Sequence, residues 1–183
     1  MNKDIKIGLA VAFQVMVIFV LIMVKLMTLS GGREILIHLL PVDPRDPLRG
    51  DYVTYQHDLT TVGGYYYGMK PVDEEQFQQG EVVYVSLVES DGFSYPGEMS
   101  HAKPADGIFI KGRIVSVDTS PDSSYEKPTY RLDYGIEQYF IPEGKGQMFT
   151  TWTQDRQAFA KVAVDTDGTP ALKQLYVDGK PWP

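Results

Sequence analysis

The sequence LPVDPRDPLRGDYV, at residues 40–53, constrains how the chain on either side of it can fold. It holds three prolines, three aspartates and two arginines within fourteen residues. Proline fixes φ and keeps the preceding residue extended, so Asp43 and Asp46 are both excluded from helix. Gly50 supplies a permissive backbone where the stretch turns into the next strand. The pattern predicts a stiff, non-helical elbow, which presents Asp43, Arg45, Asp46, Arg49 and Asp51 at short range.

The N-terminus carries the clearest signal for location. Residues 7–24 form an 18-residue apolar run in which Gln14 is polar, and residues 26–29 extend it past Lys25. At 1.5 Å per residue, such a segment spans a hydrocarbon layer of roughly 30 Å. A cleaved signal peptide usually has an apolar region of only about 7–15 residues, so the pattern favours an anchor that stays attached.

These features predict four parts: a cytoplasmic N-terminus (1–6), a transmembrane anchor (7–29), a linker (30–33) and an extracytoplasmic β-rich domain (34–183). Lys3 and Lys6 favour a cytoplasmic N-terminus by the positive-inside rule, although Lys25 and Arg33 on the other flank weaken that bias. We therefore expect a single-pass protein of the inner (cytoplasmic) membrane, with its domain in the periplasm or an equivalent extracytoplasmic space.

Composition excludes several classes of function. The formal net charge is −7, and residues 1–29 hold three lysines against one aspartate, so the rest of the chain is more acidic still. An acidic domain repels the phosphate backbone, so we expect no nucleic-acid partner. The chain has no cysteine, which excludes disulfides, thiolate nucleophiles and cysteine metal sites.

The remaining sequence predicts about seven strands, at residues 34–40, 51–57, 82–88, 108–117, 129–134, 158–164 and 172–177. Residues 71–79 suggest a short helix, residues 91–106 a proline- and glycine-rich connection, and residues 135–146 a compact turn region. Gly112, inside a long strand, suggests a bulge or bend. Short strands with little helix predict an all-β domain, a sandwich or small barrel, preceded by a single transmembrane α-helix.

Residues 44–52 resemble the signature of the bacterial membrane-anchored GDYXXLXY family, which takes its name from Gly-Asp-Tyr-x-x-Leu-x-Tyr. Residues 134–144, the hairpin around Asp167 and Gly168, and residues 175–181 are also similar to that family. Tyr55 and His57 stand where the motif has Leu and Tyr, and we expect both to keep a packing role on one strand face. The resemblance implies a fold and a membrane address but no reaction. It also implies an accessory role beside polytopic membrane proteins.

The elbow acids allow two interpretations. Carboxylates held together could bind a divalent cation or act in general acid catalysis. Two arginines interleaved with three aspartates favour ion pairs and a braced turn instead. We therefore assign a structural or interaction motif to Asp43, Arg45, Asp46, Arg49, Gly50, Asp51 and Tyr52, and predict no catalytic residue, metal site or cofactor.

A second candidate region follows the predicted strand at 129–134. Glu137 and Glu143, two carboxylates beside aromatic rings, could form a glycan-processing pair, but nothing in the sequence sets their separation. The pattern favours a capped turn or an interaction patch made of Tyr134, Gly135, Glu137, Tyr139, Phe140 and Glu143. The three histidines lack zinc spacing, and His38 is expected in the core. The run of residues 165–168 is expected to be a tight hairpin rather than a calcium loop.

Two functional hypotheses follow. The favoured one is a non-catalytic, membrane-anchored domain that acts as an accessory subunit and binds a polytopic membrane protein. The alternative is a membrane-anchored hydrolase or metal-dependent enzyme that uses Asp43, Asp46 and Asp51. Signal peptidases share an N-terminal span and a β-domain, and Ser30 with Lys111 would then be the candidate nucleophile and base.

Asp46→Asn separates the two hypotheses. If the elbow is structural, this variant unfolds at a lower temperature than the wild type, with or without Ca²⁺, because an ion pair in the turn is lost. If the elbow binds a cation, Ca²⁺ raises the melting temperature of the wild type but not that of the variant. Thermal melts of Asp46→Asn and Asp51→Asn, each with and without Ca²⁺, give the answer.

Overall fold

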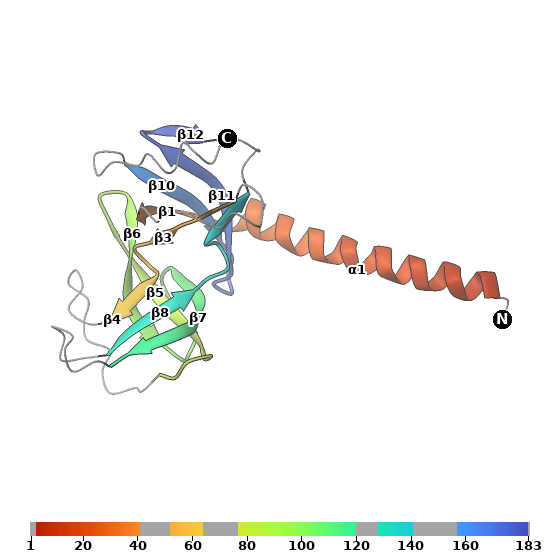
Figure 1. The fold of residues 1–183 in the computed structure, drawn as a ribbon, viewed down its shortest axis with the longest axis horizontal. Helices are drawn as coiled ribbons and strands as arrows, with labels where there is room; N and C mark the ends of the chain where they lie inside the picture. The colour runs from red at the N-terminus through yellow and green to blue at the C-terminus, as the bar shows by residue number, and fades with distance from the viewer. Residues whose placement is uncertain (1–2, 41–51, 64–76, 120–127, 141–156, 183) are drawn as a thin grey trace.

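The computed structural model describes residues 3–40, 52–63, 77–119, 128–140 and 157–182. A long N-terminal helix, α1 (Lys3–Gly31), projects away from a β-rich domain, as Figure 1 shows. The described residues of the domain form strands and turns that gather into two five-stranded sheets and one two-stranded pair. The predicted class, an all-β domain after a single apolar helix, is confirmed.

Helix α1 has the length and composition of a membrane span, although a signal sequence near an N-terminus would also have them. The apolar stretch of the helix is not buried against the domain. Phe13 and Leu21, for example, are 69% and 65% exposed. The helix continues through Gly31 and the first strand begins at Arg33, so the linker expected over residues 30–33 is reduced to Gly32.

The first sheet adjoins the helix and has the order β12-β11-β10-β1-β3. Its neighbouring strands are antiparallel, and the predicted hairpin between residues 158–164 and 172–177 is confirmed as β10 and β11. The strands are β1 (Arg33–Leu40), β3 (Gln56–His57), β10 (Ala158–Val164), β11 (Pro170–Val177) and β12 (Lys180–Trp182).

The second sheet has the order β4-β8-β7-β5-β6 and is also antiparallel. A separate pair joins β2 to β9. The strands of the second sheet are β4 (Thr61–Gly63), β5 (Val82–Ser90), β6 (Phe93–Ser100), β7 (Phe109–Asp118) and β8 (Thr129–Asp133), and those of the pair are β2 (Tyr52–Thr54) and β9 (Gln138–Phe140).

One hydrophobic core joins the two sheets. On β1, alternate side chains point inward, and Ile35, Ile37 and Leu39 are buried. They belong to the same cluster as buried side chains of the second sheet, such as Val85 and Ile110. Burial of a large aliphatic side chain contributes about 1.5–3 kcal/mol, so this shared core is the main force that holds the sheets together.

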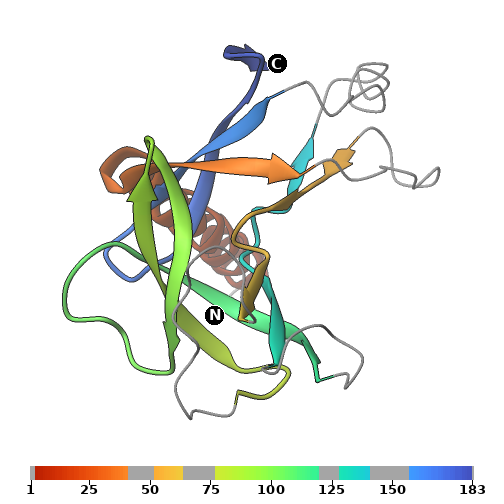
Figure 2. The ribbon, with the colours of Figure 1, turned by 90° about the vertical axis from the view of Figure 1, so that its left-hand side faces the viewer.

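The connection predicted over residues 91–106 is wrong, because residues 93–100 form strand β6. Asp91 and Gly92 adopt positive φ and form the tight turn that leads into it. Pro96 lies within the strand, and a proline is tolerated there because β6 is the edge of its sheet. The long β5–β6 hairpin lies beside β1 in Figure 2. The described end of the predicted helix, residues 77–80, forms a turn.

The role of Gly112 also differs from the prediction. The register of β7 shifts between Ile114 and Ser116, not at the glycine. A Cβ atom at Gly112 would lie 2.8 Å from Cε1 of the Tyr134 ring, which is too close for real atoms. The glycine therefore makes room for Tyr134, which is itself buried.

His38 does not lie in the core as expected. It is on the half-buried outer face of β1, because the inward positions of that strand are the odd-numbered ones. Its ring stacks on Phe93 of β6, with ring centroids 3.8 Å apart. Phe93 in turn meets Phe159 of β10 edge to face, and Phe159 stacks on Tyr176 of β11. This aromatic row fastens the tip of the β5–β6 hairpin to the first sheet.

We predict that Gly112→Ala destabilises the domain by about 1–3 kcal/mol, because the added methyl group overlaps a ring that cannot move away freely. Ser116→Ala, at an exposed position of the same strand, should change stability by less than about 0.5 kcal/mol. Urea unfolding of both variants measures the difference. Equal midpoints for Gly112→Ala and the wild type would contradict the close approach of Tyr134.

Candidate functional site

The structure describes only part of the predicted elbow motif. Asp43, Arg45, Asp46, Arg49, Gly50 and Asp51 lie outside the described residues. The motif's last residue, Tyr52, begins β2, whose backbone pairs with β9. In that register Tyr52 lies opposite Phe140, a member of the predicted interaction patch. The end of the motif and the patch are therefore neighbours in space, which the sequence did not predict.

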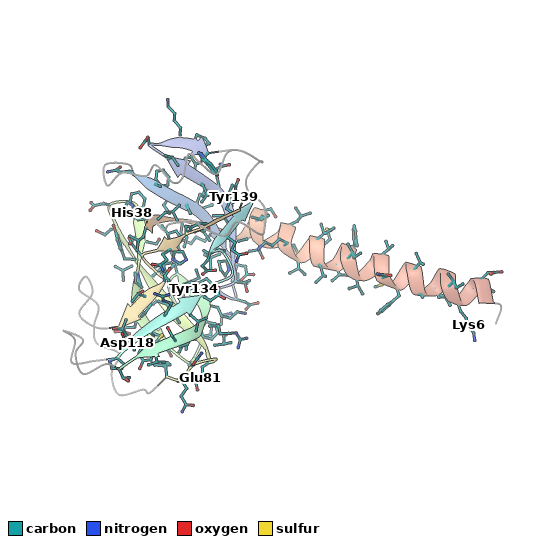
Figure 3. The ribbon with its side chains drawn as sticks, in the orientation of Figure 1. Lys6, His38, Glu81, Asp118, Tyr134 and Tyr139 are labelled. Carbon is teal, nitrogen blue, oxygen red and sulfur yellow. The ribbon has the colours of Figure 1, made fainter. Side chains whose placement is uncertain are left out.

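Most of the predicted patch is described. Tyr134, Gly135 and Glu137 lie between β8 and β9, and Tyr139 lies in β9. In Figure 3, Tyr134 lies toward the second sheet and Tyr139 lies toward the first. The ring of Tyr139 is near that of Trp182, with centroids 6.3 Å apart. Glu143, the other carboxylate of the glycan-processing hypothesis, lies outside the described residues.

The strand predicted over residues 51–57 is broken at Tyr55, where the chain passes from the β2–β9 pair to the first sheet. A few residues later it reaches the second sheet at β4. The return crossing runs from β8 through residues 134–137 to β9. We call these two segments, residues 55–60 and 134–137, the crossover segments.

Backbone hydrogen bonds join the crossover segments to each other and to the strands around them. The Tyr55 N–H donates to the Glu137 carbonyl over 3.1 Å, and the Leu132 N–H donates to the Thr60 carbonyl over 2.8 Å. The Asp58 N–H donates to the carbonyl of His38 in β1. Buried backbone groups that leave a sheet need such partners, so the crossings satisfy each other.

Two tyrosine hydroxyls reinforce this connection. Tyr55 donates to the Ile136 carbonyl, and Tyr134 donates to the Leu59 carbonyl over 3.0 Å. Each hydroxyl thus reaches from one crossover segment to the other. Both rings are buried, and burial raises the pKa of both phenols, so they remain neutral donors.

His57 lies between these tyrosines and is fully buried. Its ring centroid is 6.3 Å from that of Tyr55 and 5.6 Å from that of Tyr134. The expected packing role of Tyr55 and His57 is therefore confirmed. Among the described residues, neither ring nitrogen of His57 has a hydrogen-bond partner. Its Nε2 lies 3.6 Å from Oε1 of Glu137, which is within ion-pair range but too long for a hydrogen bond.

Glu137 caps its own turn. Its Oε1 accepts the Tyr134 N–H over 2.7 Å, and the carboxylate faces His57. Burial favours the neutral acid and raises the pKa of Glu137, but contacts with His57, Asp133 and the Tyr134 N–H outweigh burial and lower that pKa to about 2. The carboxylate therefore stays ionised inside the domain.

Two further acids adjoin the cluster, and the sequence analysis singled out neither. The hydrogen bond that Asp133 shares with Glu137 raises the pKa of Asp133, whose Oδ1 also accepts the Gly135 N–H. Burial raises the pKa of Asp58, and the nearby His38 and His57 partly oppose that change. A capping carboxylate, Glu137, four residues after an aspartate was the available signal for Asp133.

The other candidate sites lie apart from this cluster. His38, His57 and His101 lie on separate elements, and among the described residues no three His, Asp or Glu side chains are placed to hold a metal ion. In the predicted hairpin, Oδ1 of Asp165 accepts the N–H groups of Asp167 and Thr169, as a tight turn requires. Ser30 donates its hydroxyl to the Leu26 carbonyl over 2.7 Å, within its own helix.

The arrangement brings together one imidazole and two carboxylates, of which His57 is fully buried, Glu137 half-buried and Asp133 exposed. It also connects parts of the chain that are far apart in sequence, since it contacts β2, β3, β8 and β9. Among the described residues of the predicted patch, Tyr134 is buried and Glu137 caps the turn, whereas Gly135 is exposed.

We predict that Glu137→Gln lowers stability by about 2 kcal/mol at pH 7, and that the loss shrinks as the pH falls from about 4.5 to about 2. The folded state lowers the pKa of this acid, so its ionised form stabilises the fold above the unfolded value. Protonation through the folded value removes that contribution. Urea unfolding of the wild type and the variant across this pH range gives the difference.

Glu89→Gln is the matched control, because it removes an exposed carboxylate from β5. Its stability should follow the wild type at each pH. A loss in Glu137→Gln that is independent of pH would show that the ionised carboxylate does not support the crossover segments.

The GDYXXLXY protein family model matches residues 14–175, which include most of α1, both crossover segments and the domain as far as β11. No curated protein and no solved structure matches the chain. The family match covers far more than half of the sequence and includes residues 50–57, where the chain resembles the motif from which the family takes its name. The chain therefore belongs to the GDYXXLXY family.

Proposed function

We propose that the protein is a non-catalytic accessory subunit, which α1 anchors in the membrane and which binds a polytopic membrane protein. The observation that carries the proposal is the helix itself. Residues 4–31 form one helix, and the side chains of its apolar stretch are not covered by the domain. Burial of these side chains in lipid, or against other apolar helices, is strongly favourable.

Orientation is proposed from charge. Lys6 lies at the free end of α1, and Lys3 is in its first turn. Positive residues beside a span remain in the cytoplasm, so the domain would lie on the other side of the inner membrane. In an organism with an outer membrane, that compartment is the periplasm.

Gln14 supports an interaction within the membrane. It lies near the middle of α1, and its side chain is exposed, so in a lone helix the amide would face hydrocarbon. An amide without a hydrogen-bond partner is unfavourable there, whereas an amide paired with a polar group on another helix gains roughly 1 kcal/mol. A polytopic protein supplies neighbouring helices, and this is why we favour one as the partner.

The alternative, a hydrolase or metal-dependent enzyme, depends on Asp43, Asp46 and Asp51. These residues lie outside the described part of the chain, and no contact among the described residues favours that function over the accessory role.

The topology can be tested with single cysteines, because the chain has none of its own. Asp4→Cys and Glu89→Cys place a thiol at opposite ends of the molecule, both at exposed positions. In intact cells, a membrane-impermeant maleimide that reaches the periplasm should label Glu89→Cys and not Asp4→Cys. Labelling of Asp4→Cys alone would refute the proposed orientation, and recovery of the protein from the soluble fraction would refute the anchoring.

We predict that Gln14→Leu weakens the association about fivefold, which corresponds to the loss of one hydrogen bond worth roughly 1 kcal/mol. A photo-crosslinking residue at Phe13 should give one discrete product with a protein of several spans, and Gln14→Leu should reduce its yield. Val15→Leu, which changes an apolar neighbour, should leave the yield unchanged. The protein crosslinking only to itself, or to nothing, would contradict the accessory role.

A further inference from the structure

We propose that the turn between β10 and β11 rests on the phospholipid headgroups, because the end of α1 is locked to it and sets the orientation of the domain on the membrane. We call residues 165–169 the junction turn. The inference depends on α1 being the membrane anchor of the proposed function. It adds the lipid-facing surface of the domain and the contact that positions it.

The carboxylate of Asp165 holds the end of α1 to the junction turn, and we call this contact between Thr28 and Asp165 the lock. Oδ1 of Asp165 accepts the N–H groups of Asp167 and Thr169, at 2.9 Å and 2.8 Å, and so shapes the turn. Oδ2 accepts the hydroxyl of Thr28 over 3.1 Å. Thr28 is only 5% exposed, although its helix neighbour Met27 is 68% exposed. The domain therefore covers this face of the last turns of α1.

The backbone closes the same junction. The Gly32 N–H donates to the Thr28 carbonyl over 2.9 Å, so the helical hydrogen bonding continues up to the first strand. A Cβ atom on Gly32 would lie 2.5 Å from the Thr28 carbonyl oxygen and 3.0 Å from that of Val164. Only glycine allows the backbone of residue 32 to lie this close to the two carbonyl oxygens. Because Gly32 is the one residue between α1 and β1, helix and sheet have no longer linker between them.

The second sheet and the loop between β6 and β7 also contact the junction turn. Lys103 of that loop forms an ion pair with Asp167 over 2.9 Å, and the Lys111 N–H of β7 donates to the Gly168 carbonyl over 2.8 Å. Gly168 has positive φ and packs closely against the ring of Phe109. Helix, first sheet and second sheet thus meet at one turn, and α1 leaves the domain on the side of β10 and β11 in Figure 1.

The depth of the turn follows from helix geometry. Thr28 is four residues beyond Val24, where the continuous apolar run ends, which is about 6 Å along the axis. The headgroup layer extends roughly 5–7 Å beyond the hydrocarbon on each side of a bilayer. Thr28, and the turn hydrogen-bonded to it, therefore lie at headgroup depth.

The chemistry around the junction fits that layer. Lys25 and Arg33 are exposed on either side of Thr28, where their cationic groups can meet lipid phosphates. Leu26 and Met27 are exposed apolar side chains at about the same depth, on other faces of the helix. An interfacial layer accommodates both kinds of side chain, whereas bulk water would leave the apolar ones unburied.

The test measures the depth of single labels on the full chain in liposomes of phosphatidylcholine and phosphatidylglycerol. Met16→Cys, Thr166→Cys and Glu89→Cys each carry a bimane fluorophore, and the lipids carry a nitroxide either on the headgroup or in the acyl chain. Headgroup nitroxide should quench Thr166→Cys at least threefold more than Glu89→Cys. Acyl-chain nitroxide should quench Met16→Cys.

The outcomes separate the two proposals. Quenching of Met16→Cys with equal, weak quenching of Thr166→Cys and Glu89→Cys would overturn the headgroup contact and leave the anchor intact. Failure of acyl-chain nitroxide to quench Met16→Cys would overturn the anchor, and the contact with it.

The lock is tested with Thr28→Val, which removes the hydroxyl and keeps the shape of the side chain. This variant should at least halve the quenching at position 166, because the domain can then swing relative to α1. Ser30→Ala is the matched control, since the Ser30 hydroxyl bonds only within the helix among the described residues. Unchanged quenching in Thr28→Val would refute the assignment of the orientation to the contact between Thr28 and Asp165.

Discussion

The two crossings between the sheets impose the constraint on which the rest of the domain depends. A chain that leaves a sheet inside a protein gives up the ladder that satisfied its backbone, and buried N–H and C=O groups without partners are costly. Here one backbone bond, from Tyr55 to Glu137, joins the crossings at residues 55–60 and 134–137, and further bonds tie residues 55–60 to β1 and β8. Tyr55 and Tyr134 supply two more, and Glu137 closes the turn between β8 and β9. The shared apolar core can form only because this polar connection lets strands from both sheets face it.

The junction turn attaches α1 to the domain, and few residues are needed for this. One carboxylate, Asp165, shapes a hairpin and accepts a hydrogen bond from the end of α1, so the helix and the domain are parts of one unit. Asp167 of the turn forms an ion pair with Lys103, while Lys25 and Arg33 remain exposed. The turn and the crossover segments together relate the helix, the two sheets and the motif strand β2 to one another.

Local signals in the sequence predicted a large part of this structure. The apolar run predicted the helix, and short runs of apolar and branched side chains predicted β1, β5, β7, β10 and β11 to within a few residues. Strand β6 was missed because Pro96 and Gly97 suggest a loop, and a proline is acceptable only at a sheet edge, which the sequence alone does not identify. The break at Tyr55 was missed because both halves of residues 51–57 alternate correctly. Gly112 was assigned to a bulge because the ring that needs its space comes from another segment of the chain.

Burial of Tyr55 and His57 followed from their shared strand face. The grouping of His57 with Asp133 and Glu137 depends on contacts across about eighty residues of chain, which no local pattern contains.

The single glycine between α1 and β1 has a mechanical consequence. With Gly32 as the whole connection and Thr28 hydrogen-bonded to the hairpin, the helix would act as a lever if it is the membrane anchor that we propose. Span length and bilayer thickness together influence how far such a helix tilts. A change of tilt would be transmitted to the sheets as rotation of the whole domain, so that the strand leading from the family motif would change its height above the lipid. Local bilayer thickness would thereby be converted into the angle at which the domain meets its neighbours.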